Sequence, residues 1–214
     1  MMQNLREELQ KMNKKGMLII LSGPSGSGKD TILAELKKRD QSVQLSVSLT
    51  TRAPRDWEID GFHYHFVTED EFKRRLADND ILEYAKYSVN YYGTPKAPVD
   101  KWLSEGKNVV LKIEVQGAQK IREMYPDVVS IFLMPPSMPV LEQRLRNRES
   151  EDEDDIRRRM AIARDEIKRS CEYDYIVVND VVDYAVSDIC AIIQAEGLKS
   201  KRLTEEIEEV LTNG

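Results

Sequence analysis

The stretch MLIILSGPSGSGKDT, residues 17–31, decides the fold of this chain. It opens with a continuous apolar run from Met17 to Leu21, which has the composition of a short strand buried on both faces. A glycine-rich turn follows at residues 23–29. Apolar side chains then recur at helical spacing through residues 31–39. A strand, a glycine loop and a helix in this order form the first unit of an α/β fold.

The turn GPSGSGK matches the spacing G-x-x-x-x-G-K. Its glycines let successive backbone N–H groups face one phosphate chain, and the N-terminus of the following helix adds positive potential. Lys29 can then reach the β- and γ-phosphates of a nucleotide. We therefore predict a nucleotide-binding loop whose members are Gly23, Pro24, Ser25, Gly26, Ser27, Gly28, Lys29, Asp30 and Thr31.

Composition restricts the class of protein. Of the 214 residues 41% are hydrophobic and 33% are charged, and the formal net charge is −6. Such a charge disfavours a nucleic-acid binder, and no apolar run approaches the roughly 20 residues of a membrane span. The first residues carry no apolar signal core, so we expect a cytoplasmic protein with no membrane partner. Cys171 and Cys190 lack metal-ligand spacing and are expected to be free thiols.

Apolar runs at residues 109–113, 129–134 and 175–178 predict further buried strands of the same core. Residues 46–100 differ: they are rich in tyrosine, histidine and turn residues, and predict a small mixed sheet with one helix over 69–79, begun by a capping box of Thr68 and Glu71. Further helices are expected over 137–148, 154–170, about 182–196 and 198–211. We expect these parts: an N-terminal extension (1–15), a three-piece core (16–45, 101–136 and 171–196), an inserted lobe (46–100), a lid region (137–170) and a helical tail (197–214).

The inserted lobe contains SVSLTTRAPR, residues 46–55, with Arg52 and Arg55 on either side of a stiffening proline. Two guanidinium groups can grip one phosphate bidentately, and tyrosine hydroxyls can complete such a site. A carboxylate can accept from the N1–H and the exocyclic amine of guanine, an arrangement of donors that adenine lacks. The candidates downstream are Glu58, Tyr64, Glu83 and the segment NYYGT at residues 90–94.

The SVSLTTRAPR segment, with NYYG about 35 residues later, resembles guanylate kinases, and the resemblance spans about residues 17–196. It implies a P-loop core with a parallel five-stranded sheet flanked by helices, an inserted GMP-binding lobe and a lid. The implied reaction transfers the γ-phosphoryl group of ATP, bound with Mg²⁺, to GMP. The GMP phosphate would be held by Arg52, Arg55, Tyr64 and Tyr92, with Glu58 also in the GMP site, and the guanine would be read by Ser48, Glu83, Thr94 and Glu114.

By the same resemblance, Arg148 and Arg159 match two lid arginines that close over the ATP phosphates, and Arg144 matches a third. Asn179 and Asp180 match the adenine-side loop after the last strand. The implied catalytic set is Lys29, Arg52, Arg148 and Arg159.

Two residues depart from the family pattern. Asp30 stands where the family has Ser, Thr or Gly, and Lys112 stands where it has an acid that helps to hold hydrated Mg²⁺. Either Asp30 supplies a carboxylate to the metal, or Asp30 and Lys112 pair with each other. The departures keep open a second interpretation, a guanylate-kinase-like nucleotide- or protein-binding module with reduced or lost catalysis. A kinase for another nucleoside monophosphate is a third. The intact loop favours an enzyme and the two acids favour guanine, whereas the oligomeric state stays unknown.

Overall fold

The computed structural model describes residues 16–87, 89–147 and 153–212. Its core is a five-stranded sheet in the order β2-β7-β1-β8-β9, and every pairing in it is parallel. This confirms the α/β class and the parallel five-stranded core. The strands are β1 (Leu18–Ser22), β2 (Val43–Ser46), β7 (Asn108–Lys112), β8 (Val129–Met134) and β9 (Tyr175–Val178).

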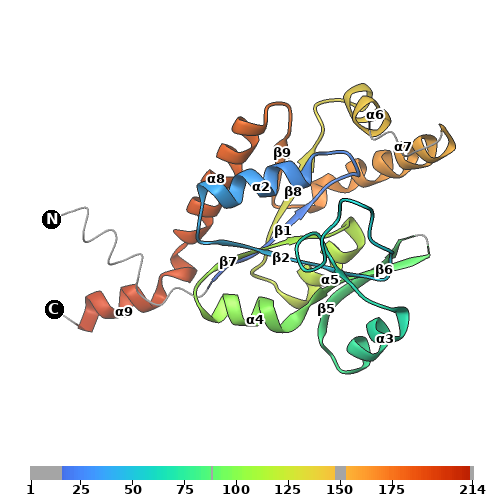
Figure 1. Ribbon diagram of the computed structural model, residues 1–214. Coiled ribbons are helices and arrows are strands. Elements are labelled where there is room, and N and C mark those ends of the chain that lie inside the picture. Colours follow the sequence, from blue (N-terminus) through green and yellow to red (C-terminus); the bar gives the residue numbers. More distant parts are fainter. Residues whose placement is uncertain (1–15, 88, 148–152, 213–214) are drawn as a thin grey trace.

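Helices cover both faces of this sheet, as Figure 1 shows. One face carries α2 (Lys29–Arg39) and α8 (Val182–Gly197), and the other carries α4 (Lys96–Ser104) and α5 (Val115–Met124). The central strand β1 is buried along its whole length. Because side chains alternate along a strand, Ile19 and Leu21 pack toward α2 and α8, whereas Leu18 and Ile20 pack toward α4 and α5.

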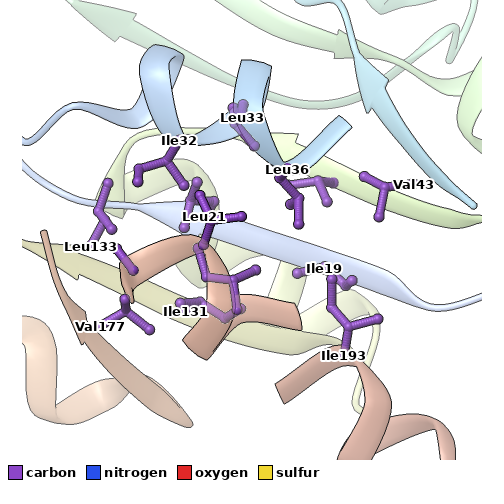
Figure 2. Close-up of a cluster of buried hydrophobic side chains, with 14 of the residues drawn as sticks. Ile19, Leu21, Ile32, Leu33, Leu36, Val43, Ile131, Leu133, Val177 and Ile193 are labelled. Carbon is purple, nitrogen blue, oxygen red and sulfur yellow. The ribbon is translucent and has the colours of Figure 1, made fainter. Parts of the chain in front are cut away.

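The cluster between the sheet and α2 and α8 is the larger apolar core (Figure 2). Ile19, Ile131 and Leu133 from the sheet meet Ile32 and Leu36 of α2, all of them at most 1% exposed. Ile193 of α8 closes the same cluster. This packing fixes the orientation of α2, whose first turn follows directly on the glycine loop.

A second sheet in the order β4-β3-β6-β5 belongs to the inserted lobe. Its strands are β3 (Leu49–Thr50), β4 (His65–Phe66), β5 (Ile81–Tyr87) and β6 (Asn90–Pro95), and α3 (Glu69–Ala77) packs on it. Thr68 begins α3 as predicted, since its hydroxyl oxygen accepts from the Glu71 N–H at 3.2 Å. The Lys120 ammonium of α5 donates to the Tyr84 carbonyl of β5 at 2.8 Å, which ties this sheet to the core.

The remaining helices lie between β8 and β9 or after α8 in the sequence. They are α6 (Met138–Arg146), α7 (Glu153–Lys168), the short 3₁₀ helices η1 (Arg169–Glu172) and η2 (Ser200–Arg202), and α9 (Thr204–Thr212). Leu141 and Leu145 of α6 and Ile156 and Met160 of α7 form a small core of their own. Among the described residues no helix has the length and apolar character to cross a membrane.

The strands and helices predicted up to residue 196 are present, with ends that differ by a few residues. The tail differs: the single helix predicted over 198–211 is replaced by η2 and α9, because the backbone is extended at Lys199. Strand β2 was not predicted. Two helices were not predicted, α4 and α5. Each carries a residue that ordinarily argues against a helix. Pro98 falls in the first turn of α4, where the missing N–H costs no helical hydrogen bond. Gly117 falls inside α5, where its lack of a side chain leaves room for Glu83.

The contribution of the small apolar core of the inserted lobe to stability can be tested by substitution of Phe72. Phe72 of α3 is 1% exposed, and its ring stacks on Tyr91 with centroids 5.4 Å apart. We predict that Phe72→Ala lowers the free energy of unfolding, measured by chemical denaturation, by about 3–5 kcal/mol, the usual cost of an aromatic cavity. Leu76→Ala, a partly buried neighbour on the same helix, should cost less. Equal losses would contradict Phe72 as the centre of this core.

Candidate active site

The glycine loop between β1 and α2 has a backbone that only glycine accommodates at two critical points. Gly23 has φ +149°, and an added Cβ would lie 2.3 Å from the Leu133 carbonyl oxygen of β8. Gly28 has φ +95°, and an added Cβ would lie 2.3 Å from the Asn179 side-chain nitrogen. The loop is therefore held in one shape against Leu133 of β8 and Asn179, the residue after β9.

Lys29, the first residue of α2, extends its side chain back over the loop. Its ammonium donates to the carbonyls of Gly23 at 2.5 Å and Pro24 at 3.1 Å. The positive charge thus lies above the loop, next to the N-terminus of α2. A helix N-terminus, oriented N–H groups and a cation together form an anion-binding site.

Asn179 supports the loop from behind. It is 3% exposed, and its side-chain amide donates to the Ser27 carbonyl at 2.7 Å. The Arg144 guanidinium donates to the Asn179 carbonyl at 3.0 Å. The structure therefore places Asn179 in contact with the phosphate loop, and leaves Asp180 exposed to solvent. Arg144 thereby helps to hold Asn179 in place next to that loop.

One lid arginine reaches the loop and the other lies outside the described residues. Arg159 of α7 donates to the Ser25 hydroxyl at 3.0 Å, which brings a second cation to the phosphate loop. The structure thus brings the loop, Lys29 and Arg159 together. Arg148 falls in the segment 148–152, so the structure does not test its placement.

The second cluster of cations lies in the inserted lobe and is organised by Glu58. The side chain of Glu58 is 3% exposed, and one carboxylate oxygen accepts from the Arg52 guanidinium at 2.7 Å. The other accepts from the Arg55 N–H at 2.8 Å. Burial opposes the charge on Glu58, but the hydrogen bond from Arg52 and that from the Arg55 N–H hold its pKa below the usual value. Glu58 thereby fixes the turn that carries both arginines.

Two tyrosines complete this acceptor cluster, which we define as Arg52, Arg55, Glu58, Tyr64 and Tyr92. The Arg52 guanidinium lies 5.5 Å from the Tyr64 ring centroid, and the Tyr64 and Tyr92 rings pack edge to face at 5.9 Å. The Arg55 side chain is exposed. The cluster presents two guanidinium groups and two phenol groups, all suited to a phosphate dianion.

A buried carboxyl group lies in the same sheet. Glu83 of β5 is 6% exposed, and it accepts from the Thr94 hydroxyl of β6 at 2.7 Å. Burial raises the pKa of Glu83, and the charge of Glu114 raises it further. Glu114 begins α5 and is exposed, whereas Ser48 is buried next to β3. These four side chains supply the acceptors and hydroxyl groups that a purine edge can meet.

Asp30 and Lys112 are paired. The Lys112 ammonium donates to an Asp30 carboxylate oxygen at 2.6 Å, and it also lies 5.1 Å from the Tyr64 ring centroid. Burial opposes the charge on Lys112, yet Tyr64 and Asp30 raise its pKa overall. Of the two arrangements left open by the sequence, the structure contains the pair, and it joins the phosphate loop to the acceptor cluster.

Glu166 was not predicted from the sequence. It lies on α7, and burial together with the charge of Glu114 raises its pKa to about 7, against the opposing effect of Lys29. The charges that act on this carboxyl thus include one at the phosphate loop, Lys29, and one at the start of α5, Glu114. The signal in the sequence was its spacing: Glu166 follows Arg159 by two helical turns and so shares its face.

Comparisons with known proteins identify relatives along nearly the whole chain. A family model described as guanylate kinase matches residues 15–196. The guanylate kinase of Halalkalibacterium halodurans is 46% identical over 198 residues, which cover 92% of this chain and 97% of that protein. That of Clostridium perfringens is 49% identical over 197 residues, with 92% and 91% covered. The crystal structure of guanylate kinase from Anaplasma phagocytophilum superposes with a TM-score of 0.77 at 34% identity, covering 92% of this chain and 95% of that one.

The raised pKa of Glu166 generates a prediction about stability and pH. Because the folded state keeps the proton up to about pH 7 while the unfolded chain releases it near pH 4.5, this group makes stability fall as pH rises between these values. Glu166→Gln removes this dependence. The free energy of unfolding of the variant, relative to wild type, should therefore increase by about 1–3 kcal/mol from pH 5 to pH 8 in urea titrations.

Asp165→Asn is the matched control, since it removes an exposed carboxyl group, paired with Lys168, from the same helix. A pH profile of Glu166→Gln parallel to that of wild type would contradict the raised pKa of Glu166.

Proposed function

This chain belongs to the guanylate kinase family, and we propose that it transfers the γ-phosphoryl group of ATP to the phosphate of GMP, giving ADP and GDP. One observation carries the proposal. Lys112 contacts Asp30, the residue after the loop lysine, and also lies over the Tyr64 ring of the acceptor cluster. A nucleotide on the loop and a phosphate on the cluster would thus meet at adjacent positions.

The reaction needs no nucleophilic side chain, because the GMP phosphate is already an oxyanion. One of its oxygens attacks the γ-phosphorus of ATP, a new P–O bond forms, and the bond from the γ-phosphorus to the β–γ bridging oxygen breaks. ADP leaves with that electron pair, and no proton has to move. Catalysis is then alignment of the two nucleotides and neutralisation of charge.

The cations of the site divide these tasks. Lys29 and Arg159 lie at the phosphate loop and would neutralise the ATP phosphates, with Arg148 assigned to the same task by sequence. Arg52 and Arg55, fixed by Glu58, would hold and orient the GMP phosphate together with Tyr64 and Tyr92. Because Glu58 bonds the Arg52 guanidinium and the backbone N–H of Arg55, the turn that presents both arginines is fixed before the phosphate arrives.

Guanine selection falls to Glu83 and its neighbours. A carboxylate oxygen can accept from the N1–H and the exocyclic amine of guanine, and the Thr94 hydroxyl already orients one Glu83 oxygen. Glu114 and Ser48 would supply further acceptors. Since Glu83 is buried, a base that fails to satisfy it leaves a polar group without a partner, and this is the basis of discrimination.

Mg²⁺ accompanies ATP in this proposal. Within the described ranges no group of three or more His, Cys, Asp or Glu side chains could hold a metal. Mg²⁺ needs no such group, since it is usually held by one or two carboxylates together with substrate phosphates and waters. Asp30, which pairs with Lys112 in the structure, would be the carboxylate for the ion once a phosphate engages Lys112. When bound, the ion adds positive charge at the β- and γ-phosphates.

We place the protein in the cytoplasm, with ATP and GMP as its small-molecule partners. Both cysteines, Cys171 and Cys190, are free thiols, in keeping with a reducing compartment. A net charge of −6 disfavours nucleic acid as a further partner.

Base selection is tested by comparing acceptors. We predict that GMP is strongly preferred over AMP in a coupled assay of ADP release, and that Glu83→Gln reduces this preference by about 1–3 kcal/mol, because an amide cannot accept from both guanine donors. Glu69→Gln, on the exposed face of α3 in the same lobe, should leave the preference unchanged. Equal turnover of AMP and GMP by the wild type would reject guanine selection, and no turnover with intact nucleotide binding would favour a binding module.

The acceptor cluster is tested through its two arginines. Arg52→Ala and Arg55→Ala should each lower kcat/KM for GMP by a factor on the order of 100, about 2–3 kcal/mol for one charge-assisted contact, with ATP affinity little changed. Arg74→Ala is the control, since this arginine lies in the same lobe but pairs with Glu71 and Asp78 on α3. Normal GMP kinetics in either cluster variant would remove that arginine from the site.

A further inference from the structure

Lys112 lies between the two groups of residues that the proposed function assigns to phosphates. It is the last residue of β7, and Leu21 of β1 is its partner across the sheet, so it stands beside the strand that leads into the phosphate loop. Ligands of such sheets bind at the carboxyl ends of the strands. If ATP occupies the loop and GMP the acceptor cluster, the group that moves passes beside this ammonium.

Lys112 contacts both the residue after the phosphate loop and the acceptor cluster. Its ammonium is 2.6 Å from an Asp30 carboxylate oxygen on α2 and 5.1 Å from the Tyr64 ring centroid in the inserted lobe. Arg52 lies 5.5 Å from the same centroid. The Tyr64 ring is therefore contacted by two cations, Lys112 from the core sheet and Arg52 from the acceptor cluster. If ATP and GMP bind as proposed, both cations lie beside the path of the transferred phosphoryl group.

The pairing with Asp30 leaves the Lys112 ammonium able to bind a phosphate as well. An ammonium has three N–H donors, so a hydrogen bond to Asp30 does not exhaust it. The side chain of Asp30 is 78% exposed, and solvent screening makes such a pair weak. A phosphate, with more charge than a carboxylate, can compete for the same ammonium or share it. The side chain of Lys112, by contrast, is only 23% exposed and stays next to Tyr64.

We propose that Lys112 is a catalytic residue, whose ammonium donates a hydrogen bond to the phosphoryl group in transit, and that Asp30 is its counterion when no phosphate is bound. The transferred group spreads negative charge over three equatorial oxygens, and fixed cations at these oxygens stabilise the transition state. Lys112 gives up neither a proton nor an electron pair in this step. Its role is electrostatic and is added to those of Lys29 and the arginines.

The first test needs neither metal nor turnover. The probe is a bisubstrate analogue that joins adenosine and guanosine through five phosphates, and its affinity is measured by titration calorimetry in EDTA. Lys112→Met should weaken binding of the analogue about tenfold or more, whereas GMP alone should bind within a factor of about three of wild type. Asp30→Asn should bind the analogue at least as well as wild type, since the phosphates replace the lost carboxylate. The double variant should match Lys112→Met.

The different effects expected for Asp30→Asn and Lys112→Met separate a catalytic role of Lys112 from a structural one. If the pair only braced the loop, Asp30→Asn and Lys112→Met would lose affinity alike, and that result would overturn the proposal. Wild-type affinity in Lys112→Met would overturn it as well. Lys38→Met and Glu35→Gln are matched controls, because they interrupt an exposed lysine–carboxylate pair of 3.2 Å in the same helix as Asp30.

The second test compares the effects of substitutions at Lys112 on kcat and on KM for GMP. Lys112→Met should lower kcat on the order of 100-fold with KM for GMP nearly unchanged, and Lys112→Arg, which keeps the charge, should recover part of the loss. A change confined to KM would overturn the assignment of Lys112 to the transferred group. Absence of GMP-dependent ADP formation by the wild type would instead reject the proposed function itself, whatever the variants do.

Discussion

The parallel pairing of β1 with β7 and β8 is the constraint on which the rest of the structure depends. Parallel strands end at a common edge, and residues that follow three of them belong to the candidate site. Gly23 follows β1, Glu114 lies just beyond β7, and Asn179 follows β9. The apolar core beneath β1 thus does more than stabilise the fold, because it holds segments far apart in sequence within hydrogen-bonding distance of one loop.

The sequence was sufficient where a signal is local. The spacing of glycines and lysine in residues 23–29 predicted the loop, and continuous apolar runs predicted the buried strands. It was insufficient where a residue acts through a distant partner. The support that Asn179 gives to Ser27, and the position of Glu166 near Lys29, arise from contacts across more than a hundred residues. The pairing of Asp30 with Lys112 was one of two arrangements that the sequence allowed, and the fold decided between them.

Charge in the candidate site follows one pattern. Acidic side chains lie behind or beside the cations and orient them: Glu58 holds Arg52, and Asp30 contacts Lys112. Two further acids, Glu83 and Glu166, have raised pKa values instead, because burial disfavours their charge. A site that must admit ATP and the phosphate of GMP therefore pairs its acids with cations or buries them where their charge is disfavoured, which leaves less negative charge to oppose the phosphates.

The contact of Asn179 with Gly28 also has a consequence for the order in which the protein is completed. The amide of Asn179 occupies the space beside the loop, yet it comes from a residue 152 positions after Ser27, whose carbonyl it supports. During synthesis the ribosome releases the loop early and its support late. A nascent chain that ends before β9 therefore lacks the support of the loop. Nucleotide binding then stabilises only chains in which β9 and Asn179 have been synthesised and have folded onto the sheet.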